Sequence, residues 1–500
     1  MKKSLEKSIV ILILLTILLK CIGFINRMVI AYFFGTTQIT DIYYNASGFV
    51  DSIASIILAS LAIGVVNIYI ANKEKGTNNR FVSNLAIIIV FLMIIIGVVT
   101  FVISDQISYW LAPGYTLNEH EQLKYMVQIM CIAFPFQGIV SVYSSVLQAE
   151  KNFIPVRLTG TVTSVASIFS VIIFAKNVGI NSLVISYIFA IIFNALFLFL
   201  CSNKYFKFKP KGVLRDFDVK RMVILIVPLL LGTAGHEINL IIDKSIASRV
   251  TQGAISALSY SCVLYLFIEN VIINSIVTAF FPNLTEMENQ GKDQEVASST
   301  RKMIILALSM LVPIMCCVYF NSVNITRIVY MRGSFDETSL SLTSAALMGY
   351  IIGLPFLAMR DIITRVYYAY DDTKFPVIVN LLSVLLNIGL DLVLYKPLGV
   401  FGITFATSVS NIFSAVVLFI MIGKYNKNIN DKGGWIILIK IVVSAAPICM
   451  INSFLCTKLS GIIAFIVCTM ISFSIEVIFL LIFKIVSIEQ IKDIIASIKH

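Results

Sequence analysis

Charged side chains interrupt the first long apolar run of this 500-residue chain. Lys20 lies near the middle of that run, Asn26 and Arg27 follow within two turns, and Asp41 lies where the next apolar run begins. Seven residues separate Lys20 from Arg27, so a helix would place both cations on one face. Such a cationic stripe is suited to binding a multivalent anion such as a pyrophosphate. The structural alternative is that Arg27 extends to the membrane surface while Lys20 pairs with an acid.

Oxygen-bearing side chains on three later apolar runs suggest a second site. From the expected outer ends of these runs, at 1.5 Å per residue, the two carboxylates and the hydroxyl lie roughly 9–12 Å below the surface. Carboxylate, amide and hydroxyl oxygens are suited to Na⁺, or to a proton if one carboxylate stays neutral. The predicted cation site consists of Asp243, Asn387, Asp391 and Thr407. The alternative is that Asp243 pairs with Lys244 or Arg249.

The composition indicates that these sites lie within a membrane. Hydrophobic residues make up 58% of the chain and charged residues only 13%, and the mean hydropathy is +0.93. A soluble core needs far less apolar sequence, so the chain is expected to be embedded in lipid. A charge at mid-bilayer costs about 2.5–3.5 kcal/mol on insertion scales, so each one is expected to face a wet cavity, a partner or a helix end.

Apolar runs of about twenty residues recur along the chain, each long enough to cross a bilayer as a helix. We expect an all-α polytopic membrane protein with about fourteen transmembrane helices. The predicted spans are 8–34, 42–71, 81–103, 121–148, 153–175, 180–202, 220–250, 254–285, 301–329, 338–368, 374–396, 400–423, 434–457 and 461–486.

The distribution of basic residues predicts the orientation. The net charge is +11, but Lys and Arg lie in loops and form no basic face of the kind that binds nucleic acid. They are roughly fivefold more frequent in alternate loops, as at 204–221, than in the loops between them. By the positive-inside rule, both termini are expected to face the cytoplasm.

Motifs repeat at a shift of about 220 residues. Residues 133–136 (AFPF) resemble 353–356 (GLPF), and residues 176–180 (KNVGI) resemble 396–400 (KPLGV). Six helices per repeat place both halves in the same orientation, an arrangement found in transporters whose substrate path lies between the halves. We therefore expect an N-terminal lobe of helices 1–6 (1–212), a C-terminal lobe of helices 7–12 (213–430), and two further helices (431–500).

Motifs of the common enzyme classes are missing from the sequence. The sequence has no glycine-rich phosphate loop, HExxH or nucleophile elbow. The nine cysteines lie mostly in apolar runs without metal-ligand spacing, so they are interpreted as small core residues. The sequence thus favours a transporter without a cofactor, apart from a possible Na⁺ or H⁺ coupling ion.

Several motifs, in order along almost the whole chain, resemble the MurJ (MviN) lipid II flippase family of the multidrug/oligosaccharidyl-lipid/polysaccharide exporter superfamily. They are residues 23–35 (GFINRMVIAYFFG) with Thr40-Asp41, residues 238–248, 281–284 (FPNL), 332–336 (RGSFD) and 365–376. This resemblance implies two lobes around a cationic cavity, with helices 13 and 14 forming a groove for a polyprenyl tail.

The resemblance also implies roles for particular residues. Lys20, Asn26, Arg27 and Asp41 fall where the family places its headgroup-binding charges. Asn239 and Arg365, in two further matching motifs, are expected to contact substrate as well. Asp243, Asn387, Asp391 and Thr407 match the family's sodium site. The chain departs from the family at Lys20 and Asn26, where arginine is frequent, and at Val263, where many members carry arginine on the eighth helix.

The expected function is alternating-access transfer of an undecaprenyl-pyrophosphate-linked sugar, most simply lipid II for peptidoglycan, across the bacterial plasma membrane. Because this chain carries fewer cations at these positions than many family members, another lipid-linked oligosaccharide, for a capsule or exopolysaccharide, stays open as the substrate. A cation-coupled multidrug exporter would favour acidic and aromatic cavity residues, and a membrane glycosyltransferase would need a large ordered outer loop. A cell-wall synthesis complex is a possible partner.

Overall fold

A computed structural model describes residues 19–213, 216–483 and 485. These residues are almost entirely helical, and none of them lies in a β-strand. The all-α prediction is therefore confirmed. The start of the predicted first span, 8–18, lies outside the described residues, as do residues 484 and 486 at the end of the last one.

Many of the helices are long and apolar enough to cross a bilayer. Ten helices of the described chain meet this criterion, or eleven when the pair Glu337–Ile352 and Leu354–Ala369, bent by 41°, counts as one span. One of the ten covers the predicted spans 374–396 and 400–423 together. The helix at 19–34 and the helix Phe217–Ala247 are not among them. The exact number of fourteen stays a prediction.

The chain divides into two compact units. Unit 1 comprises Met1–Tyr260 with the segment Arg332–Ser339. Its described helices are residues 19–34, α2 (Gln38–Glu74), α3 (Asn78–Val102), α4 (Ser104–Leu111), α5 (Leu117–Met130), η1 (Cys131–Ala133), α6 (Phe134–Ala149), α7 (Phe153–Val178), α8 (Asn181–Ser202), α9 (Phe217–Ala247) and the start of α10 (Ala254–Asn289). The units are defined by contacts and not by the repeat, so the boundaries expected at 212 and 430 stay predictions.

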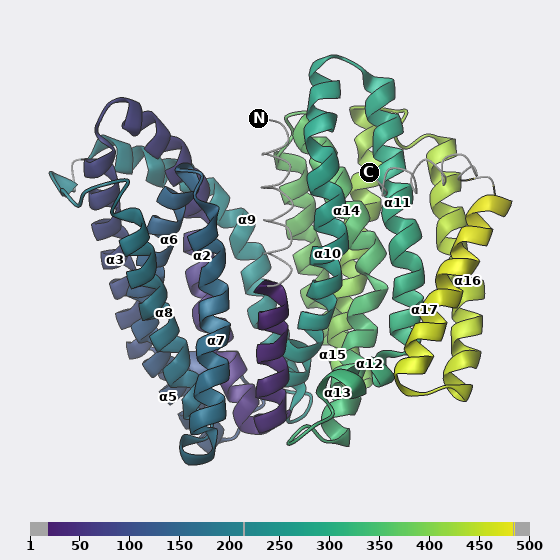
Figure 1. The fold of residues 1–500 in the computed structure, drawn as a ribbon, viewed down its shortest axis with the longest axis horizontal. Coiled ribbons are helices and arrows are strands. Elements are labelled where there is room, and N and C mark those ends of the chain that lie inside the picture. Colours follow the sequence, from purple (N-terminus) through teal and green to yellow (C-terminus); the bar gives the residue numbers. More distant parts are fainter. Residues whose placement is uncertain (1–18, 214–215, 484, 486–500) are drawn as a thin grey trace. The chain divides into compact units, whose positions relative to one another are not determined.

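Unit 2 comprises Ser261–Met331 and Leu340–His500. It contains the rest of α10, α11 (Asp293–Phe320), α12 (Ser322–Tyr330), most of α13 (Glu337–Ile352), α14 (Leu354–Ala369), α15 (Lys374–Met421), η3 (Ile422–Lys424), α16 (Lys432–Lys458) and α17 (Gly461–Ile482). In Figure 1 the last two helices form the yellow pair at the end of the chain.

The two proline motifs of the repeat have the same local structure. Pro135 lies in the first turn of α6, directly after a short 3₁₀ segment that ends α5. Pro355 lies in the first turn of α14, directly after the break at Gly353 that ends α13. The N–H groups of a first helical turn have no partner within the helix. Proline, which lacks an N–H, can therefore begin both helices without disrupting them.

The two glycine motifs also share a backbone conformation. Gly179 has φ 60° and ψ −139° where α7 ends, and Gly399 has φ 58° and ψ −137° inside α15. Residues with a Cβ rarely adopt these angles, so each motif needs glycine at this position. The kink at Gly399 also explains why α15 contains two predicted spans.

Loops from both repeats pack tightly within unit 1. A Cβ at Gly114 would lie 2.2 Å from the carbonyl oxygen of Ser248, and a Cβ at Gly333 would lie 2.3 Å from that of Tyr32. The backbone N–H of Ser334 also donates to Tyr32 O at 2.8 Å. The loop before α5 thus contacts the loop after α9, and the loop before α13 contacts the end of the first helix.

The last two helices are joined by a seam of polar contacts. Ser444 Oγ of α16 lies 2.6 Å from Glu476 Oε2 of α17, and Asn452 Nδ2 donates to Ser472 Oγ at 2.8 Å. All four side chains are buried. Hydrogen bonds between buried polar side chains are a usual means of holding transmembrane helices together.

Candidate functional site

Arg27 contacts an aromatic side chain of α2 within unit 1. Its helix, residues 19–34, places the guanidinium 4.9 Å from the ring centroid of Tyr44 on α2. Tyr44 is held in turn by an edge-on contact with Tyr260 at 5.7 Å. The side chain of Arg27 is half-buried, and no carboxylate of the described residues lies within ion-pair distance of it. Its charge is therefore available to an anion.

A second cation reaches the same turn of α2 from α9. Lys244 Nζ donates to the backbone carbonyl of Tyr44 at 2.9 Å. Gly48 makes room for it, since a Cβ there would lie 1.9 Å from Nζ. The sequence suggested Lys244 only as an alternative partner of Asp243. Its reach towards α2 depends on how two distant helices pack, which the sequence pattern did not reveal.

The sequence reasoning missed an acidic residue of α2, Asp51. Asp51 is an exposed residue of α2, and its Oδ1 accepts from Tyr187 Oη of α8 at 2.6 Å and from Gln137 Nε2 of α6 at 3.2 Å. Arg27 and Lys244 both act electrostatically on this carboxylate. The signal was available, because Asp51 is a charge inside the predicted span 42–71.

The other two residues predicted on the first helix, Lys20 and Asn26, lie on the same helix as Arg27. Lys20 is exposed at the start of the described helix, and Asn26 is half-buried. The Oδ1 of Asn26 is buried and accepts no hydrogen bond from the described residues. Because residues 19–34 are helical, the seven-residue spacing places Lys20 and Arg27 on one face. Substrate binding by Lys20 and Asn26 stays a prediction.

Asp41 has a structural role in unit 1. Its carboxylate is 1% exposed and accepts from the backbone N–H of Gly253 and of Ser256, each at 2.7 Å, and from the hydroxyl of Ser256. It therefore caps the N-terminus of α10 from a different helix, a position where a negative charge is favoured. These bonds engage the carboxylate, while the predicted contact of Asp41 with substrate stays a prediction.

Parts of the predicted cation site are visible in each unit. In unit 1, Asn239 Nδ2 donates to both oxygens of Asp243 at 3.3 Å, so a residue predicted to bind substrate contacts one predicted to bind the cation. In unit 2, Asn387 Nδ2 donates to Thr407 Oγ1 at 3.4 Å, and Asp391 lies one turn after Asn387 and is fully buried. A site that joins these two parts stays a prediction.

The described residues hold no group of three or more His, Cys, Asp or Glu side chains that could bind a metal. The predicted donor set has only two carboxylates and completes its shell with amide and hydroxyl oxygens. Such a set fits a monovalent cation or a proton better than a transition metal.

The predicted Arg365 lies in unit 2. It is exposed on α14, with its guanidinium 5.7 Å from the ring centroids of both Phe281 and Tyr368. The sequence reasoning missed Arg360, five residues earlier, which pairs with Asp361 at 2.8 Å and donates to Asn411 Oδ1 at 3.1 Å. Arg360 thus has an acidic partner, which Arg27 lacks among the described residues.

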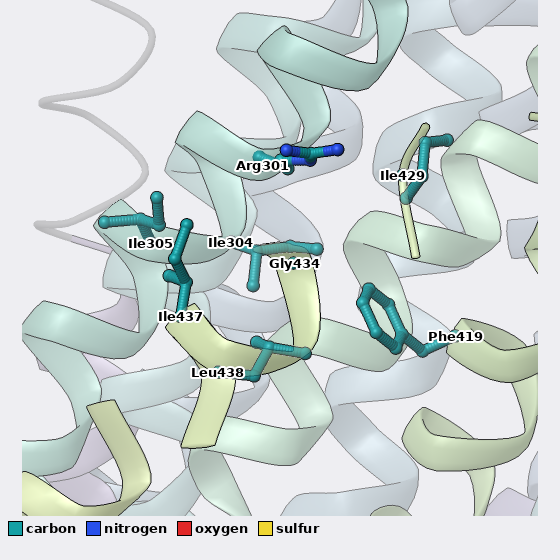
Figure 2. A pocket seen from close by; sticks show the side chains of 8 residues that line it. All are labelled: Arg301, Ile304, Ile305, Phe419, Ile429, Gly434, Ile437 and Leu438. Atoms are coloured by element: carbon teal, nitrogen blue, oxygen red, sulfur yellow. The ribbon is translucent and has the colours of Figure 1, made fainter. Parts of the chain in front are cut away.

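Figure 2 shows a small pocket in unit 2 between α11, α15 and α16. Apart from Arg301 its lining is apolar, including Ile304, Phe419 and Leu438. Arg301 pairs with Asp431 at 2.8 Å. The backbone N–H of Gly434 and the guanidinium of Arg301 lower the pKa of Asp431, which caps α16. The one cation here is already neutralised, so the pocket offers no charge to a polyanion.

Comparison with known proteins then assigns the chain to a family. The family model described as "Lipid II flippase MurJ" matches residues 30–475. The chain belongs to this family. A relative from Rickettsia prowazekii, named a probable lipid II flippase MurJ, is 27% identical over 475 residues, which cover 93% of this chain and 90% of the relative.

Solved structures show the same fold. A lipid II flippase MurJ in an inward closed conformation matches with a TM-score of 0.81 and 21% identity, over 95% of this chain and 98% of that one. An inward-facing multidrug resistance MATE transporter of the MOP superfamily matches with a TM-score of 0.67 and 14% identity, over 82% of this chain and 99% of that one. The chain is thus a multi-pass membrane protein with the fold of these transporters.

Proposed function

We propose that this protein is a transporter that moves a polyprenyl-pyrophosphate-linked sugar precursor, lipid II of peptidoglycan synthesis, from the inner to the outer leaflet of the bacterial plasma membrane. Membership of the lipid II flippase family supports the substrate class. The observation that carries the proposal is Arg27, a half-buried arginine with no acidic partner among the described residues. An unpaired guanidinium inside a membrane protein is costly unless it faces a wet cavity or binds a partner, and the pyrophosphate of the headgroup would be such a partner.

The proposed mechanism is alternating access. Arg27 and Lys244 attract the phosphates of the headgroup, while the polyprenyl tail stays in lipid. The helix breaks before Pro135 and Pro355 are places where the bundle can bend as the site changes sides. An inside-negative potential favours outward movement of the anion by about 2.3 kcal/mol per charge per 100 mV. No nucleotide hydrolysis is required.

We also propose that a cation returns the carrier to its inward-facing state. Asp243, Asn387, Asp391 and Thr407 would bind Na⁺, or a proton on one carboxylate. Transport by reconstituted protein in a Na⁺ gradient, and then in a proton gradient, identifies the ion. An Asp391→Asn variant should lose the response to that gradient. A full response in this variant would contradict the cation site.

The orientation and partners belong to the same proposal. Both termini would face the cytoplasm, which places the basic segment 204–213 on that side. Enzymes that make and use the precursor are the expected partners in a cell-wall synthesis complex. Reagent labelling of single cysteines introduced at each terminus would test the orientation.

Depletion of the protein in its host tests the function most directly. Lipid II should accumulate in the inner leaflet, and re-expression of the wild-type chain should clear it. Accumulation of a capsule or exopolysaccharide intermediate instead would assign the protein to another lipid-linked oligosaccharide. Drug sensitivity with no accumulated precursor would contradict the flippase assignment.

A further inference from the structure

We propose that Asp51 is a specificity residue that binds a protonated amine on the headgroup, opposite the cations that bind its phosphates. The inference rests on the proposed function and adds a second chemical requirement to it, namely that the preferred substrate carries both diphosphate and ammonium groups. The cations of the first helix do not by themselves require an acid at position 51 of α2.

At the position of Asp51 a carboxylate without a function would be energetically costly. It lies thirteen residues after Gln38, roughly 20 Å along α2, within a helix of 37 residues. The side chain is nevertheless exposed. A charge at this depth costs about 2.5–3.5 kcal/mol if it faces lipid, so an exposed carboxylate here indicates a wet, substrate-accessible surface of unit 1.

The hydrogen bonds of Asp51 leave half of the carboxylate open. Tyr187 Oη and Gln137 Nε2 both donate to Oδ1, at 2.6 and 3.2 Å. Neither contacts Oδ2. Two uncharged donors on one oxygen stabilise the ionised form without neutralising it, and they fix the direction of the second oxygen. The arrangement therefore presents Oδ2 as an oriented acceptor.

The surrounding charges argue for a ligand with both signs. Arg27 and Lys244 act on Asp51 electrostatically, yet no cation of the described residues forms an ion pair with its carboxylate. A site that had only to attract phosphates would be weakened by a carboxylate beside its cations. The carboxylate becomes favourable if the same ligand brings an ammonium group to Oδ2.

The test compares two lipid-linked diphosphate sugars in proteoliposomes. They differ only in one amine, which is free in the first and N-acetylated in the second. Hydrogen bonds to charged groups contribute about 1.5–3 kcal/mol, so the wild-type protein should move the free amine at least about tenfold faster. In Asp51→Asn, which keeps the shape but removes the charge, the ratio should fall to about one. Asp105→Asn, at a surface carboxylate that pairs with Lys124 at 3.0 Å, is the matched control and should keep the wild-type ratio.

Each of the other outcomes of this test contradicts the inference about Asp51. Equal rates for both substrates in the wild type, or an unchanged preference in Asp51→Asn, would overturn the inference and leave the proposed function standing. Loss of both transport activities in correctly folded Asp51→Asn would also overturn it, since it would assign Asp51 to binding a coupling proton. If wild-type protein moves neither substrate, the proposed function fails, and this assignment fails with it.

Discussion

Two carboxylates in the spans of this protein have the same nearest contact and opposite surroundings. Asp51 in unit 1 accepts from the hydroxyl of Tyr187 at 2.6 Å, and Glu476 in unit 2 lies 2.6 Å from the hydroxyl of Ser444. Asp51 is exposed and subject to the charges of Arg27 and Lys244. Glu476 is 1% exposed between α16 and α17, and its Oε1 accepts no hydrogen bond from the described residues.

The proton count at Ser444 explains how Glu476 is accommodated. The Ser444 hydroxyl lies 2.6 Å from the carbonyl of Ile441 as well as from Glu476. A hydroxyl has one proton, so if Ser444 donates to Ile441, the carboxyl of Glu476 must carry the second proton and donate to Ser444. We therefore expect a neutral acid that joins two helices in unit 2 and a charged acid that binds ligand in unit 1. If both expectations hold, access to water and nearby cations, more than residue type, determines what each of these two acids does in the membrane.

The largest effect should come from removing the cation of unit 1. Arg27→Ala should lower flipping by about 10- to 100-fold, because a charge-assisted bond to phosphate contributes about 1.5–3 kcal/mol. Flipping in proteoliposomes measures this. Arg27→Lys should retain part of the activity, since it keeps the charge but not the bidentate geometry.

Arg221→Ala, at an exposed arginine of α9, is the control for Arg27→Ala and should flip at the wild-type rate. A wild-type rate in the Arg27→Ala protein would remove the basis for treating unit 1 as the ligand-binding region.

Displacement of Lys244 without loss of its charge should have the next largest effect. In Gly48→Ala the new methyl group would lie 1.9 Å from Nζ, so the ammonium must leave the carbonyl of Tyr44. We expect flipping to fall about fivefold, equivalent to ~1 kcal/mol. Gly160→Ala on α7 is a matched control, because a Cβ added there would meet no atom within 4 Å outside its own helix backbone and chain neighbours. Equal rates in the two variants would show that the position of Lys244 is unimportant.

The neutral state of Glu476 can be tested through stability. Glu476→Leu should lower the free energy of unfolding by about 1–2 kcal/mol, because the Ser444 hydroxyl loses a buried partner. Glu476→Gln should change it by less than about 0.5 kcal/mol, because an amide can donate as a neutral acid does. Thermal unfolding in detergent measures both. Equal destabilisation by Gln and Leu would indicate that Glu476 is charged, and the contrast with Asp51 would disappear.

The smallest effect should come from the second polar contact of α16 and α17. A double-mutant cycle with Asn452→Ala and Ser472→Ala should give a coupling energy of about 0.6 kcal/mol, the average for such bonds between membrane helices. Flipping should change little in either variant. A coupling energy near zero would show that this contact does not hold the two helices together.

The sequence predicted features that depend on local pattern. The apolar runs predicted most helices, and the paired Pro135 and Pro355, like Gly179 and Gly399, marked positions where the backbone has the same structure. Contacts between distant helices could not be predicted in this way. The bond of Lys244 to Tyr44 spans 200 residues and depends on the absence of a side chain at Gly48. Asp51 is a different case, because the energetic rule applied to Lys20 would have identified it.

The cap that Asp41 forms on α10 has a consequence for biosynthesis. Its partner Ser256 follows 215 residues later. At about 5–20 residues per second, the ribosome needs about 10–40 s to supply that partner after Asp41 has emerged. During this interval the carboxylate has entered or approached the bilayer without the donors that later surround it. The nascent first helices must therefore wait beside water or an insertion factor, and release into lipid is expected only once the start of α10 has been made.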